Sequence, residues 1–162
     1  EGIDVAIRIG QLPDSSYSAI KVGTVRRVIC GSPDYFDRHG VPKQPSELSK
    51  HRIIAAVNAS TSTEWRFGRQ GKSITHVKPA LFCNSNEAAI VAARSGWGLT
   101  RVLSYQIGPD LQDGKLQTTL DEFEEAPLPI HIVHPEGRNA PAKVRAFVDL
   151  AASRLRANPL TN

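Results

Sequence analysis

The chain has 162 residues, of which 40% are hydrophobic and 22% charged, with a net charge of +4. These values are typical of a soluble globular protein with one domain, or one domain and part of another. No apolar run approaches the ~20 residues of a membrane helix, so we expect no membrane partner. The basic residues are scattered, with no run longer than Arg26-Arg27, and give little support for direct nucleic-acid contact.

The first residues indicate a chain that begins inside a protein, because the sequence contains no methionine and opens on a strand-like run. Residues 3–9 alternate between apolar and other side chains, and a Gly-Gln-Leu-Pro-Asp turn follows them. The best partner for this strand is the run at 129–135, far along the chain. The two ends therefore predict one sheet, with everything between them inserted into it.

After this turn, the pattern predicts strands over 20–32, 52–57, 64–67 and 73–83. Ser32 is expected to cap a short helix that starts at Pro33 and ends at Gly40, and Pro45 starts a second helical turn. A hairpin turn is expected over 68–72. Pro79 suggests an edge position for its strand.

The clearest helix start lies at Asn84, with Glu87 three residues later in the spacing of a capping box. The alanine-rich run 88–94 continues this helix, and Gly96 is expected to end it. Beyond it, strands are predicted over 99–103, 115–120 and 130–134, with an acidic, solvated connector over 121–127. The chain finishes on an amphipathic helix over 142–157, whose expected apolar face is Val144, Phe147, Val148, Ala151 and Leu155.

This order of elements predicts an α/β protein with a central unit over 13–125. Two strands and a helix from the chain ends form a second, smaller sheet. Such a layout is typical of a two-lobed binding protein with crossover connections.

Five blocks of sequence resemble the C-terminal effector-binding region of LysR-type transcriptional regulators. They are residues 1–16, 30–42, 65–67, 84–98 and the pair of segments 134–135 and 143–149. Each block alone is common, but all five in this order and spacing are specific. The resemblance implies a periplasmic-binding-protein-like two-lobed fold, with the second lobe complete and the first lobe only partly present.

By this resemblance, residues 1–12 and 126–158 are a remnant of the first effector subdomain. Residues 13–125 are then the second subdomain, and residues 159–162 are a tail. The family's winged helix-turn-helix would lie upstream, so contact with DNA is expected only through that absent domain. A small-molecule effector, anionic or aromatic, is expected in a cleft between the lobes, and the full-length protein is expected to be a cytoplasmic homo-oligomer.

Asn84, Ser85 and Asn86 are the first candidates for ligand binding. Free backbone N–H groups at a helix start attract a carboxylate or another anion, and the three polar side chains would orient it. The alternative is that Asn84 only caps the helix.

Arg8, Ile9, Gly10 and Gln11 are the second set, because they match family positions near the hinge, where Arg8 could pair with an anionic effector. Alternatively, Arg8 lies on the solvent face of an alternating strand. His134 and Pro135 are the third set, expected at the other crossover. A hydrogen-bonded structural role for His134 is the alternative.

The sequence offers no catalytic motif: it contains no G-x-S-x-G, Walker or H-E-x-x-H pattern, and its histidines lack the spacing of metal ligands. No enzyme activity, metal or cofactor is therefore expected. Cys30 and Cys83 are expected as buried thiols, with a disulfide or a metal site as the alternative. Trp65 and Phe67 are expected as core residues, with a ligand platform as the alternative. A solute-binding protein for transport is the alternative function, because that architecture is shared.

Overall fold

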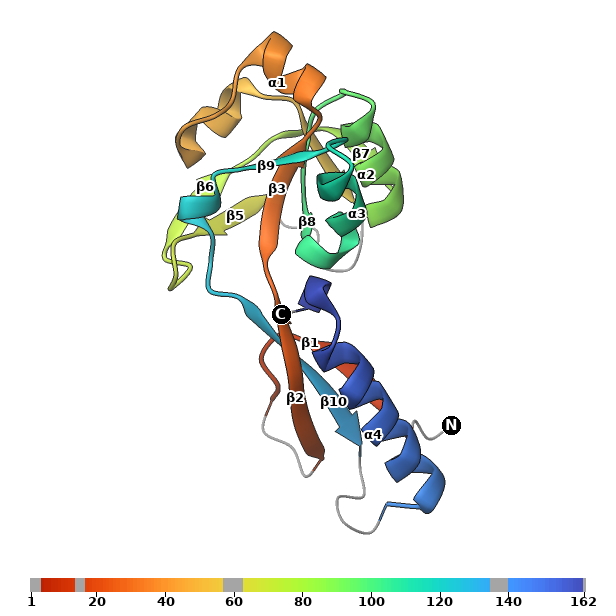
Figure 1. Ribbon diagram of the computed structural model, residues 1–162. Coiled ribbons are helices and arrows are strands. Elements are labelled where there is room, and N and C mark those ends of the chain that lie inside the picture. The colour runs from red at the N-terminus through yellow and green to blue at the C-terminus, as the bar shows by residue number, and fades with distance from the viewer. Residues whose placement is uncertain (1–3, 14–16, 57–62, 135–139, 162) are drawn as a thin grey trace. The chain divides into compact units, whose positions relative to one another are not determined.

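The computed structural model (Figure 1) describes residues 4–13, 17–56, 63–134 and 140–161. The chain forms two compact units: Glu1–Val25 with Pro127–Asn162, and Arg26–Ala126. This differs from the boundary between residues 12 and 13 that the sequence indicated. The difference arises because the strand β2 (Ser18–Val25) pairs along its whole length with β10 (Leu128–His134), and so belongs to the first unit.

The first unit contains a three-stranded antiparallel sheet in the order β1-β10-β2. The strand β1 (Ala6–Ile9) pairs with β10 from Ala6 opposite Val133 to Ile9 opposite Ile130. The predicted pairing of the two chain ends is therefore confirmed, with β10 as the central strand.

The helix α4 (Ala142–Arg156) packs along β2 and covers one face of this sheet (Figure 1). On β10, Ile130, Ile132 and His134 alternate toward the covered face and are buried. On α4, a stripe at i, i+4 and i+8 is buried against them: Val144, Val148 and Ala152. Phe147, which the sequence placed in this stripe, is instead 52% exposed, because it lies one residue ahead of Val148 around the helix.

The last residues form a 3₁₀ turn, Pro159–Thr161, and are not a free tail. Thr161 is buried, and its hydroxyl donates hydrogen bonds to the carbonyl oxygens of Leu155 and Asn158. The turn's backbone passes so close to Gly23 that a Cβ there would lie 2.1 Å from the Thr161 carbonyl oxygen. Glycine at this point of β2 therefore lets the end of the chain pack on the sheet.

The second unit contains a five-stranded mixed sheet in the order β7-β4-β8-β3-β9. The strand bounds are Pro79–Cys83 (β7), Ile53–Ala56 (β4), Leu99–Leu103 (β8), Arg27–Gly31 (β3) and Gln117–Thr119 (β9). The strand β4 runs parallel to both β7 and β8, whereas β3 is antiparallel to β8 and β9. A separate hairpin pairs β5 (Glu64–Phe67) with β6 (Ser73–His76).

Helices and short turns cover both faces of the larger sheet (Figure 1). They are α1 (Pro33–His39), η1 (Pro45–Lys50), α2 (Asn86–Arg94), η2 (Ser104–Gln106), α3 (Gly108–Gln112) and η3 (Asp121–Phe123). On β3, Val28 and Cys30 enter the apolar core beneath α2, and Ile29 enters the core on the other face. Trp65 and Phe67 are buried in that second core, as predicted.

Both cysteines are free thiols, Cys30 buried and Cys83 half-buried. Burial raises the pKa of Cys30 to about 12, and the Asp110 carboxylate adds to this shift. The Cys30 thiol is therefore protonated and belongs to the core.

Several predicted boundaries are confirmed and others need correction. The Ser32 hydroxyl accepts a hydrogen bond from the Tyr35 N–H at 3.1 Å, and α1 ends at Gly40 with a φ of 78°. The predicted strand 20–32 is two strands, because the chain leaves the first unit at Arg26. The predicted strand 73–83 is also two, and its second half is the edge strand that begins at Pro79.

Among the described residues, no helix is both long and apolar enough to cross a membrane.

Candidate functional site

The start of α2 lies at the carboxyl edge of parallel strands. The strand β7 ends at Cys83, opposite Ala56 at the end of the parallel strand β4, and α2 begins three residues later. In open α/β sheets this edge is where ligands bind, and a helix start there presents free backbone N–H groups. The segment from Asn84 to Asn86 occupies this position.

The residue that caps α2 is Ser85, not Asn84 as the sequence predicted. The Ser85 hydroxyl accepts a hydrogen bond from the Ala88 N–H at 3.2 Å, and its backbone is extended. The predicted helix start is therefore one residue too early. Because Ser85 is the residue that caps α2, helix capping gives no reason for an amide side chain at Asn84.

The second predicted set, from Arg8 to Gln11, lies on β1 and the turn after it, in the first unit. The N–H of Gly10 donates to the Pro129 carbonyl oxygen at 2.9 Å, beside the start of β10. Arg8 and Gln11 are exposed, and Ile9 is 38% exposed. This set lies next to the point where the chain re-enters the first unit.

His134 lies at the other end of β10, away from the crossover at which the sequence placed it. It is 7% exposed, and its Nδ1 has no hydrogen-bond partner among the described residues. Four positions separate it from Ile130, so the structure does not bring it together with the set around Gly10. Pro135 lies outside the described residues.

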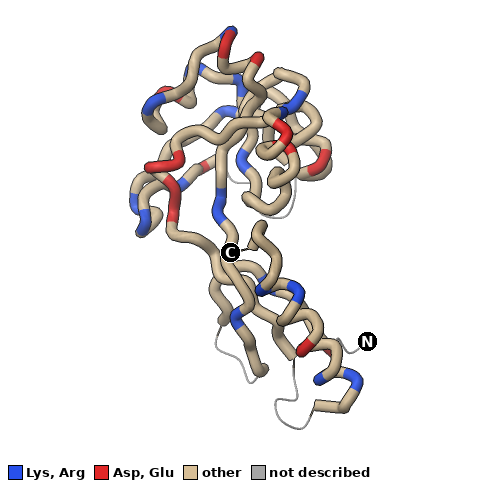
Figure 2. Tube along the Cα trace, in the orientation of Figure 1, with Lys and Arg blue, Asp and Glu red and all other residues tan. Residues whose placement is uncertain are grey.

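A network of ion pairs that the sequence did not predict flanks both crossovers, within the second unit. Figure 2 marks where charged residues lie along the chain. Arg26 donates to both carboxylate oxygens of Glu124 at 3.0 Å. Glu125 accepts from Arg27 at 3.3 Å and from Arg101 at 2.8 Å. We call these five residues the crossover clamp.

The carboxylates of the crossover clamp are largely buried, with 12% of the Glu124 side chain and 17% of the Glu125 side chain exposed. The expectation of a solvated acidic connector is therefore wrong at these two positions. Burial raises the pKa of Glu124 above its ordinary value, and Arg26 opposes this shift. The position of Arg26-Arg27 and Glu124-Glu125 beside the two crossovers is the signal that could have revealed the network.

Arg101 is the most enclosed cation of the crossover clamp. Its guanidinium lies over the rings of Trp65 and Phe67 at 5.7 and 5.6 Å, and donates to the Arg66 carbonyl oxygen at 2.9 Å. Burial lowers the pKa of Arg101, whereas the Glu125 carboxylate raises it. These contacts give Arg101 a structural role in joining β8, β5 and the segment before the crossover.

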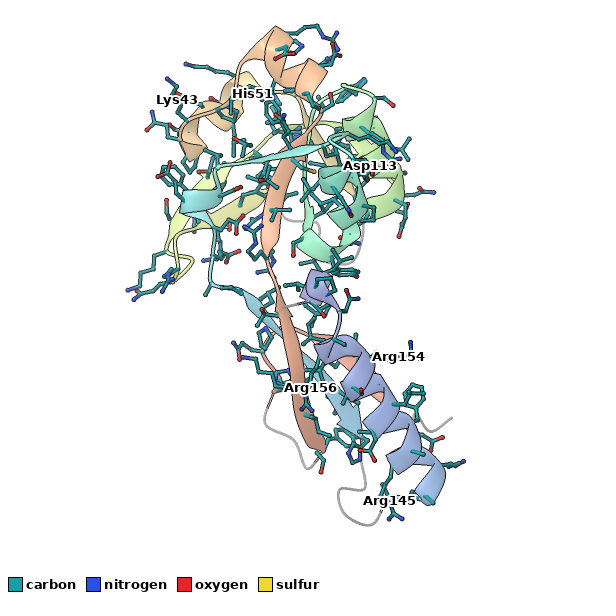
Figure 3. All side chains as sticks on the ribbon, in the orientation of Figure 1. Lys43, His51, Asp113, Arg145, Arg154 and Arg156 are labelled. Atoms are coloured by element: carbon teal, nitrogen blue, oxygen red, sulfur yellow. The ribbon has the colours of Figure 1, made fainter. Side chains whose placement is uncertain are left out.

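A second polar cluster surrounds His51 (Figure 3). The Tyr35 hydroxyl accepts a hydrogen bond from the Arg52 N–H at 3.1 Å and lies 3.0 Å from the His51 Nδ1. The hydroxyl and Nδ1 share a hydrogen bond whose donor is set by the His51 tautomer. This cluster is structural. Nothing among the described residues groups three metal-ligating side chains.

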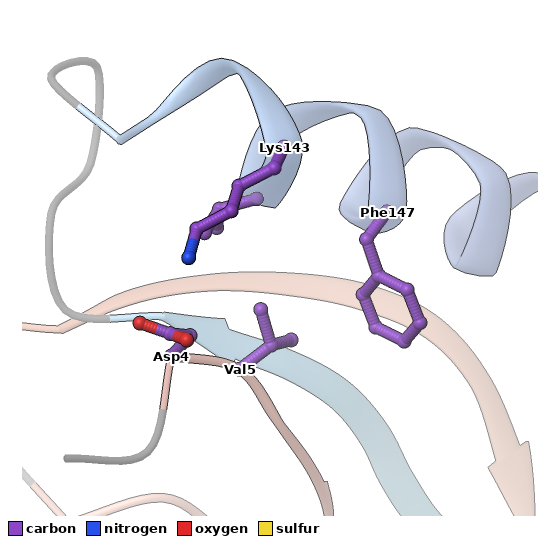
Figure 4. A pocket seen from close by; sticks show the side chains of 5 residues that line it. Asp4, Val5, Lys143 and Phe147 are labelled. Carbon is purple, nitrogen blue, oxygen red and sulfur yellow. The ribbon is translucent and has the colours of Figure 1, made fainter.

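An open groove of about 370 Å³ lies on the first unit, between the residues before β1 and the start of α4 (Figure 4). Its lining consists of Asp4, Val5, Lys143, Val144 and Phe147. Figure 4 shows the Lys143 ammonium pointing toward the Asp4 carboxylate, beside the apolar side chains of Val5 and Phe147. Phe147, assigned to the core from sequence, is thus part of this exposed surface.

The features described above are those of an α/β binding module with two units, between which the chain passes twice. The model of the LysR substrate binding domain matches residues 1–156, so the chain belongs to this family. Its fold is the periplasmic-binding-protein-like fold of LysR regulatory domains, and its family role is that of an effector-binding domain in transcriptional regulators. The family is regulatory rather than enzymatic.

Two relatives are similar over most of this chain. An uncharacterized HTH-type transcriptional regulator of Haemophilus influenzae is 31% identical over 89% of this chain and 50% of its own length. The HTH-type transcriptional regulator PgrR of Escherichia coli is 31% identical over 92% of this chain and 51% of its own length. The chain therefore spans about half the length of these relatives.

Among solved structures, the regulatory domain of CrgA, a LysR-type transcriptional regulator from Neisseria meningitidis, superposes with a TM-score of 0.79. It is 26% identical, over 94% of this chain and 76% of that domain.

Proposed function

We propose that this chain senses a small anionic or aromatic effector for a LysR-type regulator. The observation that carries the proposal is the position of α2, whose start meets the carboxyl edge of the parallel strands β7 and β4. Backbone N–H groups there favour a carboxylate, with the Asn84 and Asn86 side chains available to orient it. Arg8, Gly10 and Gln11, near the crossover, form the second candidate surface.

In the whole regulator, binding would shift the balance between two arrangements of the protein, and an upstream helix-turn-helix would respond at DNA. We further propose that the regulator acts in the cytoplasm as a homo-oligomer. The relatives described above are all transcriptional regulators, and these comparisons give no support to the transport alternative.

We also propose that the first unit is part of a larger lobe. In support, β1 is an edge strand, and Ile7, Phe147 and Leu150 are each more than half exposed. Apolar surface of this kind is normally covered by further structure. The match to only about three quarters of the CrgA regulatory domain supports the same proposal.

The site at α2 can be tested with benzoate as an anionic aromatic probe and acetate as an anionic probe. Ser85→Ala and Asn84→Asp would be compared with Ser32→Ala, which removes the equivalent cap from α1. We expect benzoate to shift the amide resonances of 84–88. Asn84→Asp should weaken that binding about tenfold through charge repulsion, whereas Ser32→Ala should leave it unchanged.

A benzoate response that is equal in Ser32→Ala and Asn84→Asp, or that lies outside 84–88, would contradict the site. A response to acetate as strong as that to benzoate would show that charge alone is recognised.

A further inference from the structure

One row of side chains crosses the three-stranded sheet of the first unit. Arg8 on β1 is directly opposite His131 on β10, and His131 is directly opposite Lys21 on β2. Directly opposite residues of antiparallel strands project from the same face of a sheet. We call Arg8, His131 and Lys21 the basic row.

The basic row lies on the face turned away from α4. Ile130 and Ile132, on either side of His131, are buried on the covered face, so His131 projects from the other one. Arg8 and Lys21 are exposed. Because neighbouring strands lie about 4.8 Å apart, the outer two backbones are about 10 Å apart. The long side chains of Arg8 and Lys21 can both reach the space above His131.

No carboxylate of the described sheet face neutralises this charge. The strands β1, β2 and β10 contain no Asp or Glu (Figure 2). The adjacent row on the same face is apolar: Ala6, Val133 and Ala19. Asp4, just before β1, lines the groove with Lys143 of α4. Arg8 and Lys21 therefore have no counter-charge among the described residues of these three strands.

His131 adds a second, independent observation. Its Nδ1 is a buried atom without a hydrogen-bond partner among the described residues. A buried polar atom left without a partner is costly and uncommon. At least one ring nitrogen of His131 is therefore not committed to a partner among the described residues.

We propose that the basic row binds a doubly charged oxyanion on the outer face of this sheet. Arg8 and Lys21 supply two permanent positive charges from the two sides, and His131 supplies a donor beneath the anion. This site is separate from the one at α2 and does not depend on it.

Sulfate is the appropriate probe, because its charge stays at −2 across the range in which histidine titrates. It would be titrated into the isotope-labelled chain at constant ionic strength, with chloride as the balancing anion. We expect saturable shifts of the amide resonances of the basic row. Arg8→Gln and Lys21→Gln should each raise the dissociation constant about fivefold or more.

The matched control is Arg154→Gln, which removes one positive charge from α4 in the same unit (Figure 3). It should change the dissociation constant by less than about twofold, because only screened, longer-range attraction is lost. An equal effect of Arg154→Gln, or an absence of saturable shifts at the row, would overturn the proposal.

The role of His131 has its own test. His131→Ala should raise the dissociation constant for sulfate about threefold or more at constant pH, because the donor between Arg8 and Lys21 is lost. The far-ultraviolet circular dichroism should stay unchanged. An unchanged dissociation constant in His131→Ala would remove His131 from the site.

Discussion

At the scale of single residues, the burial of His51 links the stability of the second unit to pH. The Tyr35 hydroxyl and His51 Nδ1 lie 3.0 Å apart and share a hydrogen bond in a part-buried site. Burial lowers the pKa of His51 below its ordinary value of 6.5, and the nearby charge of His39 lowers it further. The folded unit therefore disfavours the charged form of His51.

The sign of the pH dependence follows from this lowered pKa. Above about pH 6.5 the folded and unfolded chains both hold His51 neutral, so its contribution is fully present. As the pH falls below 6.5, the unfolded chain takes up the proton before the folded chain does. The contribution of His51 to the free energy of unfolding is therefore lost once the pH reaches the folded-state pKa. We expect the urea midpoint of tryptophan fluorescence to fall over this window. Both tryptophans, Trp65 and Trp97, lie in the second unit.

His51→Gln should flatten this dependence, because the titrating group is gone. His76→Gln, on the exposed side of β6, should preserve it. An unchanged slope in His51→Gln would show that another group titrates over this range.

At the scale of elements, the sequence was sufficient where local chemistry decides the structure. Ser32, Pro33 and Gly40 define α1 by capping and backbone geometry alone, and the alternation of 3–9 and 129–135 was enough to pair β1 with β10. The sequence was insufficient where tertiary contacts decide the structure. The sequence predicted Asn84 as the cap of α2, whereas the structure has Ser85 there. The acidic segment before the crossover, predicted as solvated, contributes to the crossover clamp.

The apolar face of α4 shows the same limit and gives a prediction. Helical periodicity placed Phe147 and Val148 together, but Val148 is 4% exposed and Phe147 52%. Val148→Ala should therefore cost about 2 kcal/mol in the first unit, through lost burial and a cavity. Phe147→Ala should change stability by only about 0.5 kcal/mol. Hydrogen exchange of the β10 amides measures this unit separately. Equal losses of protection in the two variants would contradict the assignment of the buried stripe.

At the scale of the whole molecule, the two units differ in how the chain builds them. The first unit joins segments that are more than 100 residues apart, so its sheet cannot form until both ends are present. The second unit is one continuous segment, Arg26–Ala126. Its cores and the crossover clamp all lie within that segment, and the pair of Arg26 and Glu124 holds its two ends together.

We therefore expect the fragment 26–126 to fold without the first unit. Followed by tryptophan fluorescence, its unfolding in urea should remain cooperative, with a midpoint within about 0.5 M of that of the whole chain. A shorter fragment, 32–126, is the matched control: it lacks β3, which lies between β8 and β9, and should not fold. A 26–126 fragment without a cooperative transition would mean that the second unit needs the first for its stability. A cooperative one would mean that the second unit folds independently, and that ligand binding at α2 can be measured there alone.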